Sequence, residues 1–276
     1  MIFHSSFQNI YLWLPLFGFF VGLIGTLIGG GGGGFFFIPV LIFLFRIPAH
    51  IAITTSLAAT LPICIVGSIG FYRHGYIDVR LGLLMSAAGI VGALGGATFT
   101  SILTHKQLID LYGAYSILLA LVMLRDIRKT KIEKANGIEK VDSKLKKTVK
   151  GTLFGFLGGI ITATSGATGA TPVQAGLFVM RKPLKVVIGT SLLVVLVNTA
   201  SALGAHFLVG KIDLTLIYFL TAGTIVGSLL GPKLLKGAKL ERIDGPVRFW
   251  YALSMIIFGI GMIISTFYIT TPMLPK

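Results

Sequence analysis

The chain has 276 residues, of which 54% are apolar and 12% charged, and it carries a formal net charge of +15. The mean hydropathy of +0.90 excludes a soluble domain, because a single soluble core cannot hide so much apolar surface. The composition instead predicts an all-α integral membrane protein. The positive charge does not indicate nucleic-acid binding, because the Lys and Arg residues lie in the loops between apolar stretches.

Ten apolar stretches follow one another along the chain, five in each half. They cover residues 10–28, 35–45, 51–71, 81–103 and 108–124, then 151–161, 167–180, 186–209, 214–235 and 247–268. We expect the first to be a retained membrane helix, because no Lys or Arg precedes it and no cleavage pattern of small residues follows it. The predicted parts are a first transmembrane repeat over 1–124, a basic cytoplasmic linker over 125–150 and a second transmembrane repeat over 151–276.

The second half repeats the first at a fixed offset. Residues 48–96 align with 183–231 without a gap, which matches Thr55-Ser56 with Thr190-Ser191 and Gly75-x-Ile77-Asp78 with Gly210-x-Ile212-Asp213. Upstream, at an offset shorter by two, Gly22-x-x-Gly25 and Pro39 match Gly155-x-x-Gly158 and Pro172. A duplicated membrane unit is typical of secondary transporters.

The basic residues predict that the two repeats have opposite orientations. The segment 125–150 holds ten Lys and Arg residues, so the positive-inside rule places it in the cytoplasm, where it meets anionic lipid headgroups. Counting ten crossings from this segment brings most of the other basic loops to the same side. Four crossings in each half would instead place many of them outside. We therefore expect a multi-pass protein of the cytoplasmic membrane with both termini outside.

Two stretches at matching places are shorter than the about 20 helical residues that cross a bilayer. Residues 35–45 follow six glycines, Gly29 to Gly34, and residues 167–180 follow a break rich in Ser and Thr. This pattern favours broken or re-entrant helices at the repeat interface. Bare amides and a helix N-terminus suit an anion, and hydroxyls suit an oxygen-rich one. Flexible turns or close helix contacts are the structural alternative.

The candidate substrate-binding residues belong to these breaks or to the helices beside them. They are Gly31, Gly32, Gly33, Gly34, Thr55, Ser56, Thr164, Ser165, Gly166, Thr168, Thr190, Ser191 and Asn198. The Thr-Ser pairs follow a helix-starting Pro by seven to eight residues, about 10 to 12 Å into the bilayer. Such hydroxyls can also bond to their own helix or join helices. Asn198 is either a clamp between helices or a substrate contact.

The remaining polar residues of interest have structural interpretations. Asp78 and Asp213 precede apolar helices, so we expect them to cap those helices. The histidines at 50, 74, 105 and 206 lie at or near the ends of stretches and lack metal-ligand spacing, which predicts positions at headgroup level. The glycines at 82, 89, 92, 95, 96, 223, 227 and 231 predict close helix packing. We expect no metal and no cofactor.

The doubled pattern of a Gly-rich break, a Pro, a Thr-Ser pair and Gly-x-Ile-Asp resembles the TauE/SafE family of sulfite and organosulfonate permeases. The resemblance covers nearly the whole chain outside the linker. It implies a permease for a small anion such as sulfite, an organosulfonate or thiosulfate. The inverted repeat predicts an alternating-access site at the repeat interface, and we expect export of a small sulfur-containing oxyanion. The second break departs from the family, because Ser165-Gly166-Ala167-Thr168 replaces its usual glycine core.

The charges inside the stretches bear on the cargo and on its direction. Asp110 is the one carboxylate within them, and no Lys or Arg lies near a centre, which argues against a proton pump or cation carrier. A negative cytoplasm favours anion export. The alternatives are import of thiosulfate or a small carboxylate, a membrane-embedded enzyme, or a scaffold subunit. An enzyme would need a nucleophile with a base, or a metal, and the stretches hold no such group.

Overall fold

The computed structural model of the chain describes residues 2–3, 9–30, 33–136, 144–166, 169–180, 182–207, 212–237 and 240–268. In these ranges the chain is helical, and all ten predicted apolar stretches contain a helix. The one addition to the predicted all-α class is a short parallel pairing between β1 (Ile2–Phe3) and β2 (Ile212–Asp213).

The helices succeed one another in the order that the apolar stretches predict. The first half contains η1 (Asn9–Trp13), α1 (Leu14–Ile28), α2 (Gly33–Pro39), the π-helix η2 (Val40–Leu44), α3 (Ala49–Arg73), α4 (Val79–Ile102) and α5 (His105–Asn136). The second half contains α6 (Lys144–Ser165), α7 (Ala170–Val179), α8 (Leu184–Phe207), α9 (Leu214–Gly237) and α10 (Leu240–Tyr268). Both α5 and α6 reach into the segment 125–150 that was predicted as a linker.

Five helices among the described residues are long and apolar enough to cross a membrane. They are Tyr11–Ile28, Ala49–Arg73, Val79–Ile102, Leu184–His206 and Leu214–Leu234, and shorter apolar helices cover Phe35–Leu44, Gly151–Ser165 and Ala252–Thr266. The two helices that follow the breaks, α2 with seven residues and α7 with ten, are short, as the sequence predicts.

The chain forms two compact units. The larger holds residues 1–102 and 141–240, and therefore α1 to α4 and α6 to α9, while the smaller holds residues 103–140 and 241–276, and therefore α5 and α10. Within the smaller unit the two helices approach closely at Gly113, where a Cβ atom would lie 2.8 Å from the carbonyl oxygen of Gly259.

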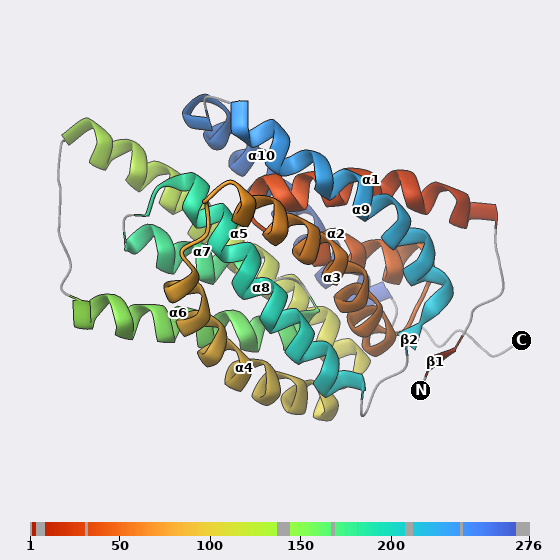
Figure 1. Cartoon of the computed structure of the whole chain (residues 1–276). Helices are drawn as coiled ribbons and strands as arrows, with labels where there is room; N and C mark the ends of the chain where they lie inside the picture. Colours follow the sequence, from red (N-terminus) through yellow and green to blue (C-terminus); the bar gives the residue numbers. More distant parts are fainter. Residues whose placement is uncertain are drawn as a thin grey trace, which may run out of the picture. The chain divides into compact units, whose positions relative to one another are not determined.

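In the larger unit, each main helix contact joins a helix of the first half to one of the second. Helix α1 packs along α9 and α4 along α6, while α3 contacts both α8 and α9, and α8 contacts α4 (Figure 1). Glycines allow the close approach, since a Cβ on Gly22 would overlap the Thr224 carbonyl and one on Gly159 the Gly89 carbonyl. Most of the predicted glycine stripe is used in this way, but Gly95 has open space beside it.

Both helices that precede a break end on a glycine in the left-handed conformation. Gly29 has φ 84° and Gly166 has φ 63°, values that side chains other than glycine rarely adopt. The Gly30 N–H turns back to the carbonyl of Gly25, and the Gly166 N–H turns back to that of Thr162 over 3.1 Å. These caps stop α1 and α6 inside the unit and place the breaks there.

Candidate functional site

The serine of each Thr-Ser pair lies against the end of an interrupted helix of the other half. The hydroxyl of Ser191 on α8 donates toward the carbonyl of Gly29 over 2.8 Å, and that of Ser56 on α3 donates to the carbonyl of Gly166 over 3.1 Å. Both serines are fully buried. Three predicted site residues, Ser56, Ser191 and Gly166, therefore lie at the breaks, where each serine covers a helix-end carbonyl.

The threonine of each pair holds the Gly-x-Ile-Asp loop of the other half. The amide of Asp78 donates to Oγ1 of Thr190 over 2.9 Å, and the amide of Asp213 donates to Oγ1 of Thr55 over 3.5 Å. The carboxylates then accept from the first turn of the following helices, Asp78 from the Leu81 N–H and Asp213 from that of Thr215, each over 3.1 Å. The predicted capping role of the two aspartates is confirmed.

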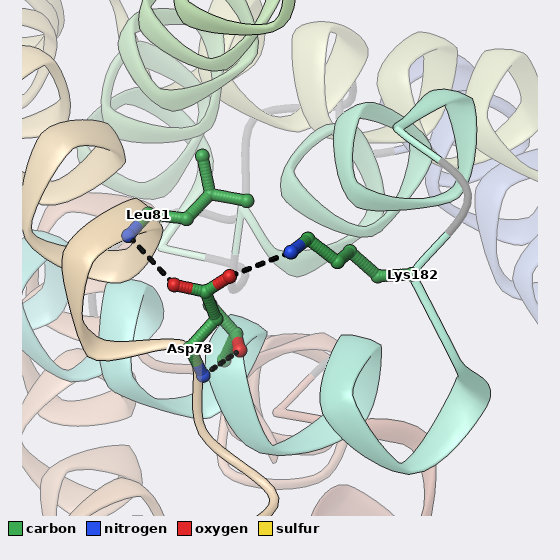
Figure 2. Close-up of polar contacts among 4 residues, drawn as sticks. Asp78, Leu81 and Lys182 are labelled. Atoms are coloured by element: carbon green, nitrogen blue, oxygen red, sulfur yellow. Dashed lines mark hydrogen bonds and ion pairs between the residues drawn. The ribbon is translucent and has the colours of Figure 1, made fainter. Parts of the chain in front are cut away.

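Asp78 also forms an ion pair between the two halves. Figure 2 shows its carboxylate between the Leu81 amide and the amino group of Lys182, which lies 2.7 Å away just beyond α7. Burial raises the pKa of Asp78, but the Lys182 and Leu81 hydrogen bonds and the charges of Lys182 and Arg80 outweigh it, so that this pKa lies below its ordinary value. The carboxylate is thus charged at neutral pH.

Side-chain donors cover the C-terminal carbonyls of α1 and α6. The Nε2 amide group of Gln174 on α7 donates to the carbonyls of Ile28 and Gly29 at the end of α1. At the end of α6, the carbonyl of Ala163 accepts from the Thr100 hydroxyl over 3.2 Å and lies 2.8 Å from Nε2 of His206. These contacts neutralise the negative ends of both helices.

His206, the last residue of the candidate membrane span Leu184–His206, packs inside the larger unit against the end of α6. Its side chain is buried, with 8% exposed, and its Nε2 carries a proton because the partner is a carbonyl oxygen. The physical reason is the end of α6, whose buried carbonyl needs a donor. The position of His206 at the end of an apolar stretch gave no sign of this contact.

The hydroxyls of the second break are occupied within the break itself. Thr164 donates to the carbonyl of Ile160 over 2.8 Å and Ser165 to that of Ile161 over 2.6 Å, one turn earlier on α6. Thr162, which was not among the predicted site residues, accepts from the Gly169 amide over 2.9 Å and so joins the two sides of the break. Of the other predicted residues, Gly33 and Gly34 begin α2, while Gly31, Gly32 and Thr168 lie outside the described residues.

Asn198 on α8 is buried without a hydrogen-bond partner. It is fully enclosed, and neither Oδ1 nor Nδ2 has a partner in the part of the chain that the structure describes. Two glycines make room for its amide, because a Cβ on Gly89 would overlap Oδ1 and one on Gly158 would lie 3.4 Å from Nδ2. A buried amide without partners costs free energy, which makes Asn198 a candidate for contact with a ligand.

The N-terminal end of α7 lies on one side of this amide. Gly158 lies next to Gly169, the N-cap residue of α7, which has no side chain to cap the helix. The N-terminal end of α7, which carries partial positive charge, therefore lies near Asn198, while donors cover the negative ends of α1 and α6. Among the described residues, no three His, Cys, Asp or Glu side chains group as metal ligands would.

Comparison with known proteins identifies the family of the chain. The protein-family model described as "Sulfite exporter TauE/SafE" matches residues 14–262, a range that contains both breaks and both Thr-Ser pairs. The chain belongs to the TauE/SafE family. It is thus a multi-pass membrane transporter and not an enzyme, as the sequence predicts.

Two similar proteins come from Bacillus subtilis (strain 168). The chain is 31% identical over 219 residues to "Probable membrane transporter protein YdhB". This alignment covers 79% of this chain and 86% of that protein. The chain is 24% identical over 238 residues to "Probable membrane transporter protein YunE", again over 79% and 86% of the two chains. No solved structure matches the chain. Membership of the TauE/SafE family therefore establishes the class of protein.

Gln174 lies at the first break and was not among the predicted site residues, although the sequence held a signal for it. It is the one side-chain amide in the short apolar helix α7, as Asn198 is in α8. An amide within an apolar membrane segment is costly unless it has a partner, so the same argument applied to both.

Proposed function

We propose that this TauE/SafE protein exports a small sulfur-containing oxyanion, such as sulfite or an organosulfonate, by alternating access at the interface of two inverted repeats. Membership of the family supports the permease activity and the cargo class. The main support for an anion is the buried Asn198 amide, which has no hydrogen-bond partner among the described residues and lies near the N-terminus of α7. An amide donor and a helix N-terminus together bind oxyanions well.

The inverted repeat is supported by contacts that recur with the halves exchanged. Gly18 and Gly22 of α1 lie against the Leu220 and Thr224 carbonyls of α9, just as Gly155 and Gly159 of α6 lie against the Met85 and Gly89 carbonyls of α4. By these contacts, Gly18 corresponds to Gly155. The sequence alignment instead matched Gly22 with Gly155, so the two alignments differ by about one helical turn. The exchanged hydroxyl bonds of the two Thr-Ser pairs follow the same relation.

The site residues divide into two roles under this proposal. Asn198 and the start of α7 contact the anion, while the serines and threonines of the two pairs hold the breaks and the Asp loops in place and exchange partners when the site changes sides. The remaining break residues line the same path, and they are Gly31, Gly32, Gly33, Gly34, Thr164, Ser165, Gly166 and Thr168.

The direction of transport follows from charge. With the cytoplasm negative, each negative charge leaves the cell downhill by about 2.3 kcal/mol per 100 mV, so export needs no coupling ion. The basic segment 125–150 supports a cytoplasmic linker and external termini.

A flux assay in proteoliposomes tests the proposal. We expect purified protein to release trapped sulfite, at a rate that rises when the inside is made negative, and ethanesulfonate to compete. Asn198→Leu should lower the flux at least about tenfold. Flux that ignores voltage and requires a proton gradient would contradict export by this route. If thiosulfate or acetate competes far more strongly than sulfonates do, the cargo is that of the alternative, thiosulfate or a small carboxylate.

A further inference from the structure

Gln174 lies where the two halves meet at the first break. Its side chain is in the middle of α7 and is buried, with 8% exposed. The helix around it is apolar apart from a threonine, so its amide depends on partners from elsewhere.

The partners of Nε2 belong to the end of α1 and to α8. Nε2 donates to the carbonyls of Ile28 and Gly29, the latter over 3.3 Å, and it lies 3.4 Å from Oγ of Ser191. Ser191 covers the same Gly29 carbonyl. A Cβ on Gly29 would lie 2.6 Å from both Nε2 of Gln174 and Oγ of Ser191, so there is no room for a side chain at Gly29. We call the contact of the Gln174 amide with Ile28, Gly29 and Ser191 the amide joint.

The second break lacks this arrangement. The Gly166 carbonyl accepts from the Ser56 hydroxyl, but the position that corresponds to Gln174 is apolar. It is Phe37 when counted from Gly29 and Gly166, and Leu41 when Pro39 is matched with Pro172. That phenylalanine is fully buried and packs edge-on against Phe17, with ring centroids 6.0 Å apart. The amide joint is therefore specific to the contact between α1 and α7.

We propose that Gln174 is a positioning residue, whose amide fixes the first break against α7 and shields the anion from the carbonyl end of α1. Without the amide, the exposed carbonyls would repel an oxyanion and the break would lose its alignment with α7. The inference rests on the proposed anion transport for its functional consequence, but the joint itself is a property of the fold.

Exchange measurements test the joint without any substrate. We expect Gln174→Met to speed amide hydrogen exchange in peptides that cover residues 25–34 and to leave peptides over 155–166 unchanged. Gln107→Met makes the same chemical change at the exposed start of α5 and should alter neither region. Equal exchange at residues 25–34 in wild type and Gln174→Met would overturn the inference.

Flux measurements then separate this inference from the proposed function. With sulfite as probe, Gln174→Met should raise the apparent KM about tenfold with a smaller change in the maximal rate. Gln174→Glu keeps the shape of the side chain and is the variant to use if Gln174→Met does not fold. Its carboxylate cannot donate, so its flux relative to wild type should fall at neutral pH and recover in acid, where the protonated group donates again. A variant-to-wild-type ratio that is independent of pH contradicts the positioning role, whereas absent wild-type flux contradicts the proposed function alone.

Discussion

The amino group of Lys182 lies 2.7 Å from the carboxylate of Asp78, and the amide of the same aspartate donates to Thr190. Two residues of the second half thus hold one loop of the first. The side chains of Lys182 and Asp78 are 33% and 27% exposed, so the ion pair is partly screened by solvent.

Asp78→Asn should destabilise the protein by about 0.2–1 kcal/mol at neutral pH, since it removes the ion pair but keeps a residue that can cap α4. The pKa of Asp78 is lowered in the folded state, so its stabilisation is present above the ordinary value of 3.8 and is lost as the pH falls through the folded pKa. Thermal unfolding of wild type and variant in detergent, from pH 7 downward, checks this. A difference that stays constant in acid, or a Lys182→Met variant that adds fully to Asp78→Asn, would show that the pair does not act as a unit.

Asn198→Leu should separate function from stability. The amide has no partner in the described part of the chain, so its replacement removes an unsatisfied buried group and should leave the unfolding temperature unchanged or higher. Sulfite flux should nevertheless fall at least about tenfold, because the anion loses a donor. Unfolding and flux are measured on the same preparation. A large loss of stability with normal flux per folded protein would make Asn198 a structural clamp.

Gly89→Ala should displace the Asn198 amide. A methyl group at Gly89 would overlap Oδ1, and such overpacking costs about 1–3 kcal/mol. Gly95→Ala is the matched control on the same helix, because nothing lies within 4 Å of a Cβ at that position. We expect reduced flux and a lower unfolding temperature for Gly89→Ala alone. Equal behaviour of the two alanine variants would remove Gly89 from the account of the site.

Thr190→Val should cost about 1–3 kcal/mol, because it leaves the Asp78 amide without its acceptor while it keeps the shape of the side chain. Thr55→Val should cost less, since the Asp213 amide donates to Thr55 over a longer distance of 3.5 Å. Thr98→Val serves as control, since Thr98 is exposed and bonds its own helix. The unfolding temperatures of the three variants check the order. A Thr98→Val effect as large as that of Thr190→Val would show that the bond to Asp78 is not what matters.

The sequence predicted the helices well and the partners of its polar residues less well. Apolar runs and left-handed glycines depend on local chemistry, so α1, its end at Gly29 and the short α7 could be predicted. The bonds from Ser191 to Gly29 and from Gln174 to Ile28 join residues more than a hundred positions apart, and no local pattern specifies such partners. Thr164 could bond its own helix or a ligand on sequence grounds, and only the geometry showed the bond to Ile160.

Labelling of engineered cysteines from one side of the membrane tests the inverted repeat most directly. Cys64 is the one cysteine of the chain and is buried, so a Cys64→Ala background allows Tyr76→Cys and Lys211→Cys, which the sequence alignment matches, to be labelled separately. The account predicts that an impermeant maleimide labels Lys211→Cys in intact cells and Tyr76→Cys only in inverted vesicles. Labelling of both cysteines from the same side would contradict the opposite orientation of the two halves.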